Sequence, residues 1–209
     1  MKKIILFCVC LCMMVGIFVG NTGAVNISDN EIFKTRYGFN PDIDYAALMI
    51  EAAANGNIEV GREYERLRNL KKDYFGIKDS VTFDDLYLLA KIVEVEAGAS
   101  WMEIEHKRLV ASVVLNRIAS PEFPNTMREV FYQRGQYQLA GTKYFEKLVP
   151  SESSAKEALY VLQYGSIAPK SVVFQAEFRQ GSGVYKKFSP AKLGTTYFCY
   201  SSYPELYEE

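Results

Sequence analysis

Apolar side chains recur every three or four positions between residues 82 and 98. They are Phe83, Leu86, Leu89, Ala90, Val93 and Ala97. This spacing places them on one face of an α-helix, which we expect to begin near Thr82 and to end at Gly98. With about 100° of turn per residue, Glu96 falls among apolar neighbours, whereas Glu94 falls near the polar edge.

A carboxyl group among apolar neighbours loses hydration, so we expect the pKa of Glu96 to be raised. Such a group can hold a proton near neutral pH, as a general acid must. The alternative is that Glu96 is an ordinary hydrogen-bonded residue at the edge of a core.

Related patterns predict further helices. Asp44 to Ala54 and Asn57 to Asp73 are separated by the stop signal Asn55-Gly56 and form a charged helical hairpin. Its second helix is expected to turn four apolar residues inward: Ile58, Tyr64, Leu67 and Leu70. We interpret the hairpin as a structural arm, with contact to a partner as the alternative.

The chain after Gly98 continues as helices and then changes character. Helices are expected at Lys107 to Ile118, Thr126 to Tyr132 and, capped by Ser151, Glu152 to Tyr164, with a polar-aromatic loop at Gln133 to Gly141. Beyond Ser171, short β-type runs appear: Val172–Phe174, Val184–Phe188 and Tyr197–Tyr200. The predicted fold class is α+β, a mainly helical lobe followed by a small β-rich lobe, with a binding cleft between them.

The first 24 residues have the layout of a secretory signal. Two lysines precede an apolar run from Ile4 to Gly20, and small residues reach Ala24. We expect residues 1–24 to be a signal peptide or, because the run is long, an uncleaved membrane anchor. Cys8, Cys10 and Cys12 lie in this run, which leaves Cys199 without an intramolecular disulfide partner in the mature chain.

Composition narrows the function classes. The net charge of −1 gives no electrostatic case for nucleic-acid binding. A single His and the absence of a ligand-spaced cluster predict no metal and no cofactor. A thiol peptidase or amidase using Cys199 and His106 is the competing enzyme class, but Cys199 lies mid-strand and His106 lies among charges at a helix start.

An ordered set of motifs carries a resemblance to a known family. The motifs are Leu88-Leu89-Ala90-Lys91, Glu96-Ala97-Gly98, Arg108–Ala111, Val113–Arg117, Ser120–Thr126, Val130–Tyr132 and Gly135-Gln136-Tyr137. In this order and with nearly this spacing, the chain resembles the SleB/CwlJ-type cell wall hydrolases from roughly Phe83 to Tyr200. Two departures are a longer connection from Glu96 to Asn116 and the presence of Glu94, which would raise the pKa of Glu96 further if both faced the cleft.

The resemblance implies a lysozyme-like or lytic-transglycosylase-like lobe that degrades peptidoglycan, with Glu96 as the catalytic residue. The expected reaction is cleavage between N-acetylmuramic acid and N-acetylglucosamine in glycan strands, by one glutamate and with a 1,6-anhydro product, and spore cortex is an expected substrate. The alternatives are hydrolysis with a second carboxylate, or a wall-binding protein without activity. The candidates for that second carboxylate are Glu94, Asp84, Asp85 and Glu177.

For substrate binding we select amides beside aromatic rings, because rings cover the apolar faces of sugars while amides pair with their polar groups. These residues are Gln136, Tyr137, Gln138, Phe174 and Gln175. Asn116 and Arg117 are expected to fix the following turn. The expected organisation is a leader at 1–24, the hairpin arm at 25–78 and a catalytic domain at 79–209. We expect a monomer that is secreted or at the cell wall and meets the membrane only through an uncleaved leader.

Overall fold

The computed structural model describes residues 29–190 and 194–207, and the chain divides into two compact units, residues 1–42 and 43–209. Of the first unit, the described part contains one helix, α2 (Asp29–Tyr37). The predicted leader at 1–24 lies outside the described residues. None of the helices in the described ranges is both long and apolar enough to cross a membrane.

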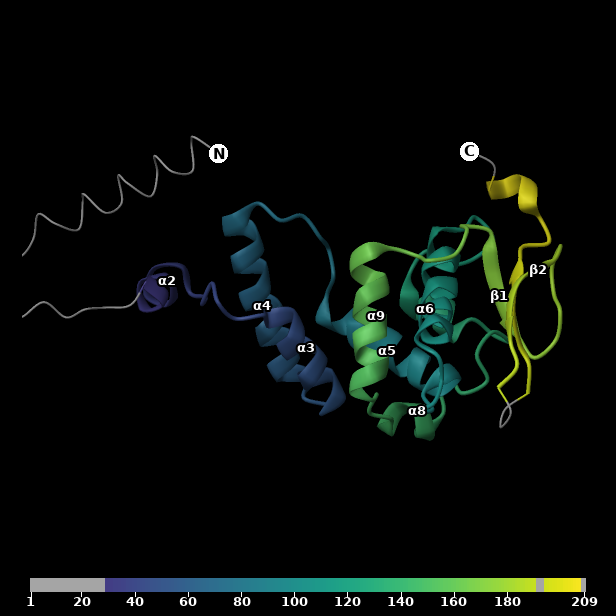
Figure 1. Ribbon diagram of the computed structural model, residues 1–209, viewed down its shortest axis with the longest axis horizontal. Helices are drawn as coiled ribbons and strands as arrows, with labels where there is room; N and C mark the ends of the chain where they lie inside the picture. Colours follow the sequence, from purple (N-terminus) through teal and green to yellow (C-terminus); the bar gives the residue numbers. More distant parts are fainter. Residues whose placement is uncertain (1–28, 191–193, 208–209) are drawn as a thin grey trace, which may run out of the picture. The chain divides into compact units, whose positions relative to one another are not determined.

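The second unit holds the remaining helices and one small sheet (Figure 1). Its helices are α3 (Tyr45–Ala54), α4 (Ile58–Phe75), α5 (Phe83–Ala97), α6 (Ile104–Ala119), α7 (Met127–Tyr132), α8 (Lys143–Lys147) and α9 (Glu152–Tyr164). The strands are β1 (Val172–Ala176), β2 (Val184–Phe188) and β3 (Thr196–Tyr200), followed by the 3₁₀ turn η1 (Pro204–Tyr207). This arrangement confirms the predicted α+β class, mainly helical with a small C-terminal sheet.

Side-chain caps set the beginnings of the principal helices where the sequence predicts them. The carboxylate of Asp44 accepts from two backbone N–H groups at the start of α3. The hydroxyl of Thr82 accepts from the backbone of Asp85 at the start of α5, and Ser151 caps α9 in the same way. Two expectations need correction, because α6 begins at Ile104 rather than Lys107 and α8 follows the loop where no helix was predicted.

Helix α5 lies at the centre of the core. All six residues of its predicted apolar face are buried, which confirms the helical face read from the sequence. Helices α6 and α9 pack against it, and the hairpin of α3 and α4 covers α5 and α9 (Figure 1). The contact between α4 and α5 is close: a Cβ atom on Gly61 would lie 2.1 Å from the ring of Phe83.

The predicted inner face of α4 is wrong at Ile58, which is exposed. The buried residues of α4 are instead Gly61, Arg68 and Lys72. Both cations are held by Asp79, which lies after the helix and forms ion pairs with them at 2.5 and 2.6 Å. Because a buried charge is tolerated when it is paired, α4 turns these charged residues inward.

The sheet is antiparallel in the order β1-β3-β2, with the last strand in the middle. Helix α6 holds β1 through two buried side chains. The amide of Asn116 donates to the backbone oxygens of Pro169 and Val172, and Arg117 Nε donates to that of Val173. These two residues therefore join the helical part to the sheet, rather than fixing the turn after α6.

Candidate active site

Glu96 lies in the last turn of α5, where the helical part meets the sheet. It lines a cavity of about 290 Å³ together with its neighbour on α5 and with residues of β1, of the segment that follows β1 and of the start of β3: Val95, Gln175, Ala176, Glu177, Gly194 and Thr196. The cavity is thus in the place where the sequence predicted a cleft, between the helical and β-rich parts.

The environment of Glu96 favours its protonated form. Burial raises the pKa of Glu96, and the positive charge of Arg117 offsets only part of this rise. The side-chain amide of Gln175 donates to Glu96 Oε2 at 3.1 Å. A carboxyl group that holds its proton more tightly than usual is suited to donate it into the cavity. The predicted direction of the pKa shift is confirmed.

Arg117 is part of this site, although the sequence interpretation assigned it to a turn. It is buried, its guanidinium lies 5.0 Å from the ring centre of Phe123 and 5.3 Å from that of Tyr137, and its charge acts on Glu96. The one signal in the sequence is a cation near the end of a helix whose other residues are largely apolar. The cation balances the site electrostatically while it holds β1.

Glu94 faces a different part of the molecule. Its Oε2 accepts from both the backbone N–H and the hydroxyl of Ser151, at 3.0 and 2.6 Å. Burial by itself would raise the pKa of Glu94, but these hydrogen bonds outweigh it and the pKa is lowered. Glu94 therefore stays ionised at the start of α9 and is not among the groups that shift Glu96. The two carboxylates do not share the cleft.

Of the five residues predicted to bind substrate, Gln175 and Tyr137 have an interaction with Glu96. Gln175 contacts Glu96 directly. Burial raises the pKa of Tyr137, and the charges of Arg117 and Glu96 act on it in opposite directions, so it lies within the electrostatic reach of the site. Phe174 packs edge-on against Phe123 at 6.3 Å.

The two remaining glutamines of the set, Gln136 and Gln138, lie on the loop before α8. Neither they nor Phe174 are among the described residues that line the cavity. Their roles in substrate binding stay predictions.

The arrangement disfavours the thiol enzyme. His106 stacks on Phe188 with ring centres 4.6 Å apart and also contacts Phe198 edge-on. Burial lowers the pKa of His106 to about 4, and neither ring nitrogen has a hydrogen-bond partner among the described residues. Because adjacent strand residues point to opposite faces, Cys199 lies on the other face of β3 from Phe198. In the described ranges, no group of three or more His, Cys, Asp or Glu side chains is placed to hold a metal ion.

Comparison with known proteins finds similarity to one family. Residues 103–199 match the model of the cell wall hydrolase family. The matched segment spans somewhat less than half of the chain, so over these residues the protein is similar to cell wall hydrolases. The matched segment includes Arg117, Tyr137 and Gln175 but begins after Glu96.

A solved structure is also similar. The catalytic domain of the Bacillus cereus SleB protein aligns with 58% of this chain and 94% of its own, with 20% sequence identity and a TM-score of 0.44. Comparison with curated proteins gives no match.

Proposed function

We propose that the protein cleaves the glycosidic bond between N-acetylmuramic acid and N-acetylglucosamine in peptidoglycan, with Glu96 as its acid and base. The observation that carries the proposal is a carboxyl group of raised pKa on the wall of a cavity, in a chain whose residues 103–199 match the cell wall hydrolase family. Acid–base catalysis by one positioned group contributes on the order of 10²–10⁴-fold in rate.

In the first step, neutral Glu96 gives its proton to the glycosidic oxygen, and the bond from that oxygen to C1 of the muramic acid breaks. Because the amide of Gln175 donates to Oε2, that oxygen acts as the carbonyl of the acid and the proton resides on the other oxygen. Arg117 lies close enough for its charge to stabilise the carboxylate that the transfer leaves behind. Gln175 and Arg117 thus position and balance the acid.

In the second step, the carboxylate of Glu96 takes the proton of the sugar's own 6-hydroxyl while that oxygen bonds to C1. The product is a 1,6-anhydro sugar, and Glu96 regains the proton that it lost. This scheme needs one carboxylate, and Glu96 is a carboxylate whose pKa is raised at the site.

Hydrolysis is the second candidate, since Glu177 lines the same cavity as Glu96. A second carboxylate there would activate a water molecule or form a covalent intermediate. The other three candidates are engaged elsewhere: Asp84 with Arg62, Asp85 with Thr82, and Glu94 with Ser151. The choice therefore reduces to Glu96 alone or Glu96 with Glu177.

Mass spectrometry of muropeptides released from purified peptidoglycan tests both reaction schemes. We expect anhydro products from the wild type, none from Glu96→Gln, and the wild-type pattern from Glu177→Gln. The matched control is Glu103→Gln, which changes an exposed carboxylate outside the cavity. Reducing products that disappear in Glu177→Gln would establish hydrolysis, and undiminished glycan cleavage by Glu96→Gln would overturn the proposal.

The cell wall lies outside the membrane, so we also propose that residues 1–24 direct export and that the enzyme acts as a monomer on glycan strands. Spore cortex is the proposed substrate, with vegetative wall as the alternative. Digestion of both materials in parallel tests this point, because a cortex enzyme releases products faster from cortex than from vegetative wall.

A further inference from the structure

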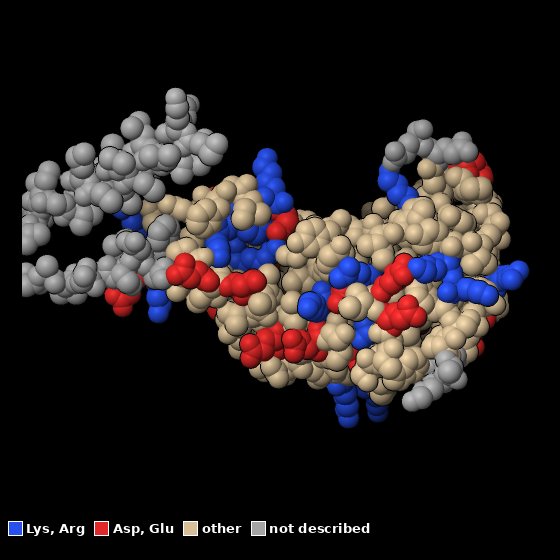
Figure 2. All heavy atoms as spheres, viewed as in Figure 1, with Lys and Arg blue, Asp and Glu red and all other residues tan. Residues whose placement is uncertain are grey.

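A second cavity, of about 380 Å³, lies between the hairpin and the end of α9 and shares no residue with the cavity of Glu96. Four cationic side chains and two carboxylates line it: Arg68, Lys71, Lys72, Lys78, Asp44 and Asp79. The lining therefore carries two more positive charges than negative ones. In the space-filling view, Lys and Arg side chains gather over α4 (Figure 2).

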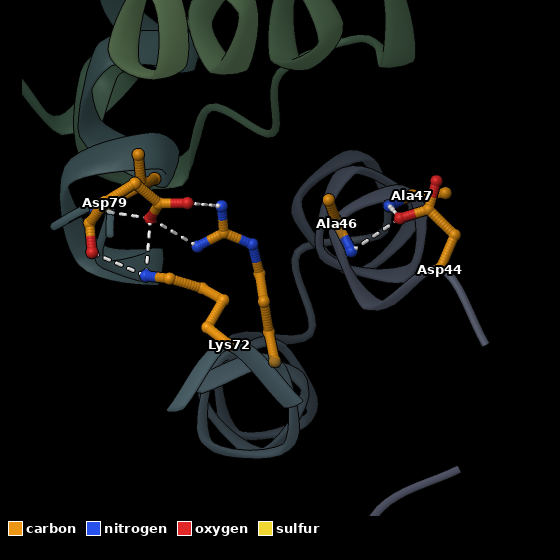
Figure 3. Close-up of polar contacts among 7 residues, drawn as sticks. Asp44, Ala46, Ala47, Lys72 and Asp79 are labelled. Atoms are coloured by element: carbon orange, nitrogen blue, oxygen red, sulfur yellow. Dashed lines mark hydrogen bonds and ion pairs between the residues drawn. The ribbon is translucent and has the colours of Figure 1, made fainter. Parts of the chain in front are cut away.

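The two carboxylates are already engaged. Figure 3 shows Asp79 bonded to Lys72 and Asp44 turned onto the backbone of Ala46 and Ala47 at the start of α3. Asp79 also accepts hydrogen bonds from both terminal nitrogens of Arg68, so one carboxylate faces two buried cations. The base of the cavity thus keeps a positive charge that no carboxylate of the lining neutralises.

Two further lysines add to this charge. Lys71 Nζ donates to the backbone oxygen of Ile43, a neutral acceptor, at 2.9 Å. The side chain of Lys78 is exposed at the opening of the cavity. An ammonium group whose partner is a carbonyl or water retains its full charge, and its hydrogen bonds are stronger to an anion than to a neutral group.

An aromatic surface continues from the charged cavity. Asp44, Ala46, Gln163 and Tyr164 also line a neighbouring cavity of about 330 Å³ that runs along α9. Tyr164 is 74% exposed, and the centre of its ring lies 4.9 Å from that of Tyr160, one helical turn earlier. The guanidinium of Arg108 covers the Tyr160 ring at 3.6 Å. An exposed ring beside an amide and cations suits a sugar that carries an anionic group.

We propose that this groove, formed by the two cavities, binds an anionic segment of the cell wall polymer away from the bond that is cleaved. A carboxylate or phosphate lies against Lys71 and Lys78, and a neighbouring sugar ring lies on Tyr164. The proposal rests on the cell wall as substrate but not on the chemistry at Glu96. The groove holds the enzyme on the wall between successive cleavages.

Sedimentation of the protein with purified insoluble wall measures this binding directly. In a Glu96→Gln background, the pair Lys71→Ala and Lys78→Ala should weaken retention about tenfold at low salt. The exposed pair Lys143→Ala and Lys147→Ala removes the same charge from α8 and should change retention less than about twofold. Equal loss of retention in both double variants, or no loss in either, would overturn the proposal.

Two further variants exclude a folding artefact. Lys78→Glu changes one exposed side chain and should weaken retention, and Tyr164→Ala should do so without changing the dependence on salt. Wild-type retention by both would contradict the groove. In the protein that retains Glu96, all four groove substitutions should leave activity on short soluble muropeptides unchanged. Failure of the proposed function would instead appear as cleavage by the Glu96→Gln protein.

The source of the anion is found by treating the wall. One sample of wall is treated with acid to remove phosphate polymers, and another has its peptide carboxylates converted to amides. One of these two treatments should abolish the difference in retention between the two double lysine variants. The treatment that does so identifies phosphate or carboxylate as the ligand. A difference that persists after both treatments would show that the groove does not bind an anion.

Discussion

Glu94 and Glu96 lie two residues apart on α5, yet their pKa values are shifted in opposite directions. Replacement of each by glutamine should therefore have opposite effects on stability. Burial makes ionised Glu96 unfavourable, so the folded protein holds that proton more tightly than the unfolded chain does. Each unit by which its pKa is raised removes about 1.4 kcal/mol from the free energy of unfolding at high pH.

The dependence on pH follows from this sign. The free energy of unfolding falls as the pH rises from the ordinary pKa of Glu96, 4.5, through its raised pKa in the folded protein. Glu96→Gln should equal the wild type at low pH and should become more stable across that interval. The gain should then stay constant at higher pH.

Glu94→Gln should show the reverse. Ionised Glu94 accepts two hydrogen bonds from Ser151, and glutamine weakens both because it carries no charge. We expect a loss of about 1–2 kcal/mol near pH 7. The loss should disappear as the pH falls below the lowered pKa of Glu94, where the wild-type carboxyl is also neutral.

Urea unfolding at a series of pH values from about 3 to 8 measures both variants against the wild type. The slope with urea should be the same for all three proteins, because the surface exposed on unfolding is unchanged. If Glu96→Gln lost stability near neutral pH, or if both variants changed in parallel, the assignment of opposite environments to the two carboxylates would be wrong.

Gly61→Ala should destabilise the protein by about 1–3 kcal/mol, although alanine normally stabilises a helix interior, because the new methyl group overlaps the ring of Phe83. Phe83→Leu in the same chain should recover part of the loss in thermal unfolding, and a stabilised Gly61→Ala would refute the close contact. Asn116→Leu should cost about 2–4 kcal/mol, because the buried oxygens of Pro169 and Val172 lose their donor. Urea unfolding measures this loss, and wild-type stability would show that β1 is held otherwise.

The helices, and the face of α5 on which Glu96 lies, could be predicted because both depend on neighbours along the chain. The periodicity of α5 fixes its buried face, and the side chains of Thr82 and Ser151 supply the caps of α5 and α9. The partners of Glu96 could not be found in this way. Gln175 follows 79 residues later, and only the folded chain brings its amide to the carboxylate.

Charged residues also misled the interpretation of α4. A hydrophobic pattern assigns Arg68 and Lys72 to the surface, but pairing with Asp79 makes their burial favourable. Arg117 was assigned to a turn for a similar reason, because its backbone and aromatic contacts lie in segments distant in sequence. The β-type runs predicted the three strands, whereas the order β1-β3-β2 depends on pairing that no local signal specifies.

The position of β3 in the middle of the sheet has a consequence for biosynthesis. Neither β1 nor β2 pairs with the other, so each waits for a strand that leaves the ribosome after both. Thr196, where that strand begins, is translated 100 residues after Glu96, which takes about 5–20 s at ordinary rates of elongation. Until β3 has been made, no complete sheet holds Gln175 beside Glu96. The nascent chain therefore lacks this contact while α5 is already complete, and the proposed activity can appear only after β3 has left the ribosome.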